Sequence, residues 1–158
     1  MTIVLDAMGS DNYPEPEVKA AYLAARELQE EIILVGQEEK LKPLMNQHSD
    51  SALVRLVHAP DVLKMTDKPA RNARKKAENS MAVGMELVKT GQADAFVTAG
   101  NTGGAMANGL FRLGRIRGVK RPALTTILPT RTGSVIALDI GANADCKPLY
   151  LLQFGVMG

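Results

Sequence analysis

Short runs of branched apolar residues alternate with segments of helical periodicity along the chain, and this alternation constrains the fold more than any other feature. The runs lack a polar residue at every second position, so both of their faces are expected to be buried. That pattern is typical of a mostly parallel sheet with helices on both sides. It predicts a single α/β domain over residues 1–158. The expected strands are Thr2–Asp6, Ile32–Val35, Leu53–Val57, Ala95–Thr98, Ala123–Leu128 and Val135–Asp139, and the expected helices are Glu15–Gln29, Glu38–Gln47, Pro69–Lys76, Ser80–Lys89, Ala105–Leu113 and Pro148–Met157. The last two strands flank Thr-Arg-Thr-Gly, so they also fit an antiparallel hairpin within the sheet.

Composition narrows the class of protein. Apolar residues make up 46% of the chain and charged residues 23%, which is an ordinary balance for a globular domain. No apolar run approaches the roughly 20 residues of a membrane span, and the opening strand does not read as a signal peptide. The one cysteine, Cys146, forms no internal disulfide and fits a reducing compartment. We therefore expect a cytoplasmic protein.

Positive charge is concentrated in two stretches. Residues 64–76 hold six basic residues and one acid, and residues 112–121 hold five basic residues and no acid. Together they hold 11 of the 19 Lys and Arg residues, so each stretch is either a solvated surface or a region that attracts anions. Neither stretch has interleaved aromatic residues, and no nucleic-acid-binding signature is present. Nucleic acid is therefore not an expected partner.

Three of the expected strands end in loops that combine glycine with short polar side chains. These loops read LDAMGSDNYP from residue 5, AGNTGG from residue 99 and LDIGANADCKP from residue 138. Ligands of open α/β sheets bind beyond the carboxyl ends of the strands, and such loops let backbone N–H groups approach a ligand closely. Asp6 and Asp139, which each close a strand, fit a role in binding a metal, a role in orienting a polar group, or a capping role in their loops. The three loops predict a site for a phosphate-sized anion.

The AGNTGG loop joins a strand to a helix with very little side chain. Its glycines leave amide groups uncovered, and Asn101 or Thr102 can cap the helix, so the helix amino terminus can bind an anion. The alternative is a tight turn whose glycines only let the helix and the strand pack. A Gly103→Val substitution is expected to separate the two, because a branched side chain would fill the anion cradle without disturbing the fold.

Other chemistry-bearing motifs are weak. The AGNTGG loop lacks the spacing of a dinucleotide fingerprint, and GLFRLG at 109–114 lacks the Lys-Ser/Thr of a phosphate-binding loop. His48 and His58 are expected to be solvated or satisfied locally, and Cys146 to be a packing residue. No His/Cys spacing supports zinc, so neither a metal nor a cofactor is expected.

Three stretches together carry a family resemblance: VLDAMGSD near the start, ARKKAENSM with ELVKTGQADAFVTAGNTGGAMA in the middle, and LDIGANADCKPLYLLQFGVMG at the end. They resemble the bacterial phosphate acyltransferases of phospholipid synthesis (PlsX family), in order and through essentially the whole chain. The chain departs from the family pattern at Ser10 and Asn12, where the family usually has a second glycine and often a histidine. It also has Thr98 where the family usually has serine.

The resemblance implies a Rossmann-like three-layer α/β/α fold with a mostly parallel sheet, similar to isopropylmalate dehydrogenases and phosphotransacetylases. It implies that acyl phosphate is made from fatty acyl-acyl-carrier protein and inorganic phosphate, without a cofactor, and passes to a membrane glycerol-3-phosphate acyltransferase. A homodimer and a cytoplasmic protein with peripheral membrane contact are implied for full-length members. Those members are about twice as long, so this chain is expected to be an amino-terminal half.

The resemblance also implies roles for individual residues. Loop amides would hold phosphate, and a cation from Arg74, Lys75 or Lys76 would place it. Asn101, Asn143 or a loop amide would donate to the thioester oxyanion. The candidate catalytic residues are Asn101, Asn143 and Lys76, and the candidate substrate-binding residues are Asp6, Gly9, Arg74, Gly100, Thr102, Gly103, Gly104, Asp139 and Gly141. An acidic carrier protein would be drawn to the basic stretches.

Two other functions remain open. One is a dehydrogenase-like cousin that binds a nicotinamide cofactor, against which the missing fingerprint counts. The other is a fragment that binds an anion or a carrier protein without turnover. The apolar side chains of residues 148–158 predict self-association or marginal stability of the isolated chain, with little or no turnover.

Overall fold

The computed structural model describes residues 1–48, 52–141 and 145–158. They form two compact units, Met1–Gly114 and Arg115–Gly158. Each unit has its own sheet and is described by itself.

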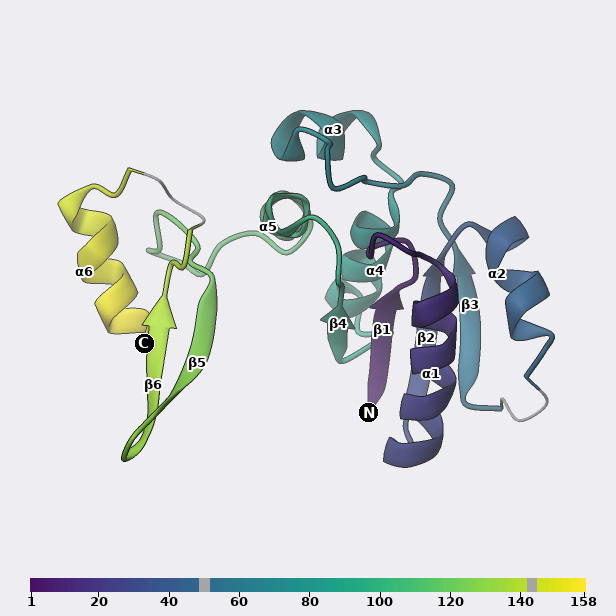
Figure 1. Cartoon of the computed structure of the whole chain (residues 1–158). Coiled ribbons are helices and arrows are strands. Elements are labelled where there is room, and N and C mark those ends of the chain that lie inside the picture. Colours follow the sequence, from purple (N-terminus) through teal and green to yellow (C-terminus); the bar gives the residue numbers. More distant parts are fainter. Residues whose placement is uncertain (49–51, 142–144) are drawn as a thin grey trace. The chain divides into compact units, whose positions relative to one another are not determined.

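A four-stranded parallel sheet forms the centre of the first unit (Figure 1). The inner strand β1 (Thr2–Asp6) is followed on one side by β2 (Glu31–Gly36) and β3 (Val54–His58). On its other side lies β4 (Ala95–Val97). The chain therefore builds outward from β1 to β3 and then returns, so the strand order reverses between β1 and β4.

Helices pack on both faces of this sheet. Ile32 and Leu34 of β2 lie in one core cluster with residues of α1 (Glu15–Leu28) and α2 (Glu38–Met45). The intervening residues Ile33 and Val35 lie in a second cluster with α4 (Ser80–Lys89). Successive strand residues point to opposite faces, which explains why this run has no polar member. The α/β class with a parallel sheet is confirmed.

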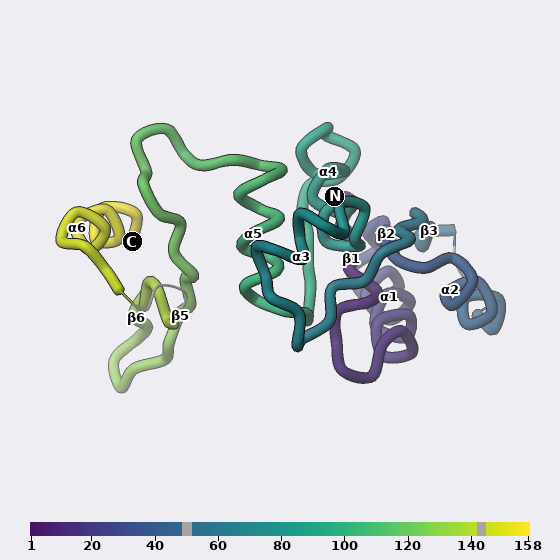
Figure 2. Tube along the Cα trace, turned by 90° about the horizontal axis from the view of Figure 1, so that it is seen from above, coloured from purple at the N-terminus to yellow at the C-terminus, as the bar shows by residue number. Residues whose placement is uncertain are grey.

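Two further helices pack together beside α4. Ala73 of α3 (Pro69–Lys75) and Ala107 of α5 (Thr102–Arg112) share a third cluster with Leu63 and Met81. Figure 2 shows α3 beside α5. Helix α5 begins at Thr102 rather than at Ala105, so Gly103 and Gly104 of the AGNTGG loop lie in its first turn.

The second unit contains the expected hairpin and the last helix. Strands β5 (Thr125–Thr130) and β6 (Gly133–Leu138) pair antiparallel, which confirms the hairpin. Its expected place within the parallel sheet is wrong, because the two strands form a separate two-stranded sheet. Helix α6 (Pro148–Met157) follows the hairpin. Across the described ranges, no helix is both long and apolar enough to cross a membrane.

Candidate functional site

The first two predicted loops do meet at one edge of the sheet. The carboxyl ends of β1 and β4 are neighbours, since Leu5 pairs with Val97 in the parallel register. The strand order reverses between these two strands, and ligands of open parallel sheets bind at such a point. Residues 7–14 connect the end of β1 to α1, and residues 98–101 connect the end of β4 to α5, so the two loops leave the sheet from neighbouring strands.

A buried carboxylate joins these loops. The Thr98 hydroxyl donates a hydrogen bond to Asp6 Oδ2 at 2.7 Å, and the Met8 N–H donates to Asp6 Oδ1 at 3.0 Å. Asp6 is 0% exposed, so its side chain stabilises the two loops from the interior and does not reach the surface. Burial raises the pKa of the Asp6 carboxyl, an effect that hydrogen bonds from Ser80 and Thr98 oppose.

Two glycines let the loops touch. A Cβ on Gly9 would lie 2.8 Å from the Gly100 amide nitrogen, and a Cβ on Gly100 would lie 3.0 Å from Gly9 Cα. The first distance is too short for any side chain to be accommodated without moving backbone. Close backbone approach therefore requires glycine at this point of the site.

The amino terminus of α5 has amide donors that the fold leaves available. Asn101 caps the helix, and its Oδ1 accepts the Gly104 N–H at 2.8 Å. Within the described ranges, the hydrogen bonds found include none from the Thr102 or Gly103 N–H. Both amides lie in the first turn of an 11-residue helix, where the helix dipole also favours negative charge. The arrangement can hold a phosphate-sized anion.

The remaining atoms of the Asn101 side chain bind the segment before α3. Its Nδ2 donates to the carbonyl oxygens of Met65 at 2.9 Å, Asp67 at 3.3 Å and Lys64 at 3.4 Å. The side chain is therefore occupied on both its oxygen and its nitrogen, and it fixes residues 64–67 against the start of α5.

The Lys76 side chain also binds this segment, through Val62 and Asp67. Its ammonium donates to Asp67 Oδ2 and to the Val62 carbonyl oxygen, each at 2.6 Å. The pKa of the Asp67 carboxyl lies below its ordinary value, chiefly because of the hydrogen bond from Lys76. Arg74, by contrast, is exposed, and its guanidinium carbon lies 5.1 Å from the centroid of the Phe111 ring.

Gly103 has a packing role as well. A Cβ at this position would lie 2.6 Å from Cγ of Pro69, at the start of α3. Gly103→Val would therefore force α3 and α5 apart, and the expectation that it leaves the fold undisturbed is wrong. At Gly104 the nearest atom to an added Cβ would be Leu63 Cδ1 at 3.4 Å, which is an ordinary contact.

Sequence reasoning missed two sets of side-chain contacts in the first unit, one buried between Asn79 and Asn108 and one partly buried at Thr98. Asn79, which caps α4, and Asn108 of α5 exchange side-chain hydrogen bonds at 3.3 Å. Asn108 is a polar residue in an apolar helical stretch, and that contrast could have indicated a buried partner. Thr98 was expected only as the end of a strand, although it bridges Asp6 and Gly100.

The third predicted loop belongs to the second unit. There, Asp139 and Gly141 both have positive φ angles, 62° and 100°. The Cys146 thiol donates to Asp139 Oδ2 at 3.5 Å. Burial is the largest cause of a raised pKa of the Cys146 thiol, and the hydrogen bond to Asp139 is the second. Asn143 lies outside the described residues. The participation of these residues in the site stays a prediction.

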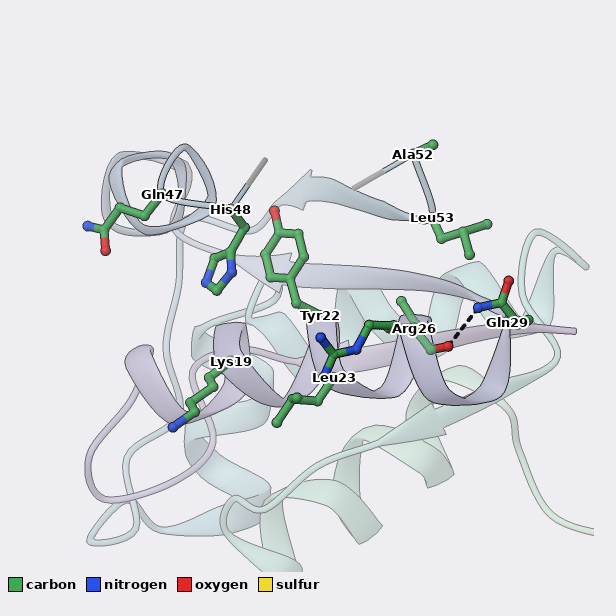
Figure 3. Close-up of a pocket in the computed structure, with 10 residues that line it drawn as sticks. Lys19, Tyr22, Leu23, Arg26, Gln29, Gln47, His48, Ala52 and Leu53 are labelled. Carbon is green, nitrogen blue, oxygen red and sulfur yellow. Dashed lines mark hydrogen bonds between the residues drawn. The ribbon is translucent and has the colours of Figure 1, made fainter. Parts of the chain in front are cut away.

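A separate cavity of about 530 Å³ lies along α1, towards the amino ends of the strands (Figure 3). Lys19 and Arg26 line it, together with Tyr22 and His48, whose rings stack 4.1 Å apart. The other histidine, His58, accepts the Glu38 N–H at 3.3 Å through Nδ1. In the described part of the chain, no three His, Cys, Asp or Glu residues are grouped so as to hold a metal ion.

The profile of a family described as fatty acid synthesis protein matches residues 1–158. The chain belongs to the fatty acid synthesis protein family. Among relatives, the phosphate acyltransferase of Pelotomaculum thermopropionicum is 49% identical over 158 residues, which cover 100% of this chain and 46% of that protein. The phosphate acyltransferase of Herpetosiphon aurantiacus is 48% identical over 159 residues, covering 100% and 43%. That of Geobacter sulfurreducens is 45% identical over 159 residues, covering 100% and 46%.

These relatives confirm the resemblance to phosphate acyltransferases drawn from the sequence. This member of the fatty acid synthesis protein family spans about half the length of the curated relatives it matches.

Proposed function

We propose that the protein forms acyl phosphate from a fatty acyl thioester of acyl carrier protein and inorganic phosphate, for phospholipid synthesis. The single observation that carries this proposal is the pair of available amides, Thr102 and Gly103, at the α5 amino terminus. They lie in the helix that follows β4, at the point where the strand order reverses. Family membership and the names of the relatives supply the reaction.

The chemistry suits a site built from backbone amides. A phosphate oxygen attacks the thioester carbonyl carbon, the C–S bond breaks, and the carrier thiolate leaves and takes up a proton. Phosphate is already partly dianionic near neutral pH, so a strong protein base is not required. The site must place the phosphate and stabilise the developing oxyanion, and both tasks suit preorganised N–H donors.

Residue roles follow from the contacts. Thr102 and Gly103 bind phosphate through their amides, and Arg74, which is exposed over Phe111 in the last turn of α5, adds positive charge alongside the same helix. Asn101 and Lys76, whose side chains are occupied by the segment before α3, act by positioning. Asp6 supports the loops through its bonds to Met8 and Thr98, Gly9 and Gly100 allow the loops to approach, and Gly104 donates its N–H to the Asn101 cap. In the second unit, described by itself, Asp139 and Gly141 are proposed to bind substrate and Asn143 to act in catalysis.

The same proposal covers the wider setting of the protein. The first unit is the Rossmann-like layered core of a larger fold similar to those of isopropylmalate dehydrogenases and phosphotransacetylases. The full protein is a cytoplasmic homodimer with peripheral membrane contact, and its product feeds a membrane glycerol-3-phosphate acyltransferase. A second candidate, an anion- and carrier-binding half without turnover, is favoured by the length of the chain relative to its relatives.

Turnover can be tested in a chimera that has the length of a curated relative. Residues 1–158 would be joined to the remainder of the Pelotomaculum phosphate acyltransferase, and acyl phosphate would be trapped with hydroxylamine. We expect product that depends on both phosphate and acyl thioester, and at least about a tenfold loss of rate on Thr102→Pro, which removes one amide donor. Thr102→Ala keeps that donor and serves as the control. A folded chimera without product would contradict the proposal.

A further inference from the structure

Five cations from one short segment face solvent beside α5. They form a surface that we call the cationic ridge: Lys64, Lys68, Arg71, Arg74 and Lys75. The one acid of the segment, Asp67, is bonded to Lys76. The charges of Asp67 and Lys76 cancel each other, so the five cations of the ridge keep a net positive charge.

The ridge lies on the outer side of α3. Asn72, Ala73 and Lys76 turn inward, where Ala73 joins the core and Lys76 binds Asp67. On a helix with 3.6 residues per turn, Arg71, Arg74 and Lys75 fall within about 100° of one another on the opposite side. These three side chains are exposed, so they can contact one partner surface together.

The ridge is also fixed beside the proposed phosphate site. Asn101, which caps α5, donates to three carbonyl oxygens of residues 64–67. Pro69, the first residue of α3, lies against Gly103 in the first turn of α5. The end of the ridge at Lys64 and Lys68 therefore lies beside the α5 amino terminus, whereas Arg74 at its other end lies over Phe111 in the last turn of α5.

Two apolar side chains border the ridge. Met65 is 47% exposed, and Phe111 of α5, beneath Arg74, is 45% exposed. Isolated apolar groups among cations suit a protein partner whose rim is acidic and whose centre is apolar. They do not form the broad apolar face that an amphipathic helix inserts into a lipid surface.

We propose that the cationic ridge docks an acidic helix of the carrier protein that delivers the acyl thioester; this inference rests on the proposed function. From Lys68 to Lys75 the helix rises by about 10 Å, which is longer than one phosphate ion and matches a row of carboxylates along a partner helix. Docking there brings the carrier to the edge of the site at which its thioester must meet phosphate.

The test compares two matched double substitutions in this chain. Arg71→Glu with Lys75→Glu reverses two ridge cations, neither of which makes an ion pair in the described structure. Lys19→Glu with Arg26→Glu reverses one lysine and one arginine on the exposed side of α1 and changes the net charge equally. Binding of a fluorescently labelled, acidic acyl carrier protein would be measured by anisotropy at low and high salt, after circular dichroism confirms folding.

We expect wild type and the α1 variant to bind alike, and the ridge variant to bind at least about tenfold more weakly with a flatter salt dependence. Equal binding by the ridge variant would overturn the proposal. Equal weakening of both variants would overturn it too, because it would show a diffuse charge effect. Absence of carrier binding, with binding instead to vesicles of anionic lipid, would assign the ridge to a lipid surface.

Phosphate titrations of the same samples separate this proposal from the proposed function. A phosphate response at the α5 amides without carrier binding overturns the docking alone. Carrier binding that is lost in the ridge variant, without any phosphate response, supports the docking and contradicts the phosphate site.

Discussion

The Thr98 hydroxyl donates to the buried Asp6 carboxylate at 2.7 Å and accepts the Gly100 N–H at 3.0 Å. One small side chain thus bonds β1 to the turn after β4, at the reversal of strand order. Because the hydroxyl proton is directed to Asp6, the oxygen lone pair is free to accept the Gly100 amide. The conformation of the turn that leads into α5 depends on this arrangement.

Thr98→Val keeps the shape of the side chain and removes the hydroxyl. It should lower the free energy of unfolding by about 1–3 kcal/mol, because Asp6 Oδ2 loses a buried donor. It should also weaken phosphate binding, since Gly100 is no longer held. Thr98→Ser retains the hydroxyl and should preserve both properties. Urea unfolding of the two variants checks this, and equal destabilisation by both would contradict it.

Acid should weaken the attachment of the segment before α3. The pKa of Asp67 is lowered by Lys76, so the folded chain releases this proton more readily than the unfolded chain. The associated stability is present above the unfolded pKa of about 4 and is lost as pH falls through the folded pKa. Lys76→Met should therefore flatten the loss of stability below about pH 4. Lys89→Met, which removes an exposed ion pair with Glu86, is the control. If Lys76→Met lost stability below about pH 4 as steeply as wild type, the prediction would be contradicted.

Two glycine-to-alanine changes should act in opposite directions. Gly9→Ala places a Cβ 2.8 Å from a backbone nitrogen and should destabilise the chain and disturb the phosphate site. At Gly109, in the middle of α5, the nearest atom to an added Cβ is Met85 Sδ at 4.0 Å. Gly109→Ala should therefore raise stability by about 0.5–1 kcal/mol through helix propensity. Thermal unfolding of both variants gives the comparison; a harmless Gly9→Ala would show that the loops are not in close contact.

The last helix should cause self-association. Phe154 of α6 is 5% exposed, whereas Leu152 is 66% and Val156 is 80% exposed. Contiguous exposed apolar side chains of this kind favour association. Leu152→Gln with Val156→Gln should lower the mass measured by light scattering without lowering the melting temperature. A wild-type chain that runs as a monomer at all concentrations would contradict this expectation.

Local signals predicted most of the elements, and distant contacts explain what they missed. The first strand and α4 were expected with the same bounds, because apolar runs and a capping Asn79 mark them within a few residues. Asn101 was one of two residues, with Thr102, that were expected to cap α5, and it is the one that does so. Its bonds to residues 64–67 were not expected, since those partners lie 34 to 37 positions away in the chain. Similarly, a local turn predicted the β5–β6 hairpin, but only long-range pairing decides which sheet it joins.

The central claim is that the first-turn amides of α5 bind phosphate, and Thr102 allows one of them to be deleted. Thr102 is the first residue of the helix, a position at which proline is well tolerated. The preceding residue, Asn101, has a ψ of 110°, which is compatible with a following proline. Thr102→Pro removes the N–H while keeping the helix, and Thr102→Ala removes only the side chain beyond Cβ.

The measurement is a phosphate titration of the isotope-labelled chain, followed through the amide resonances of Gly100, Gly103 and Gly104. Wild type and Thr102→Ala should show saturable shifts at these amides, and Thr102→Pro should bind phosphate at least about tenfold more weakly, because it lacks a donor at the anion site. Unchanged phosphate affinity in Thr102→Pro, or shifts confined to other parts of the chain, would contradict the account.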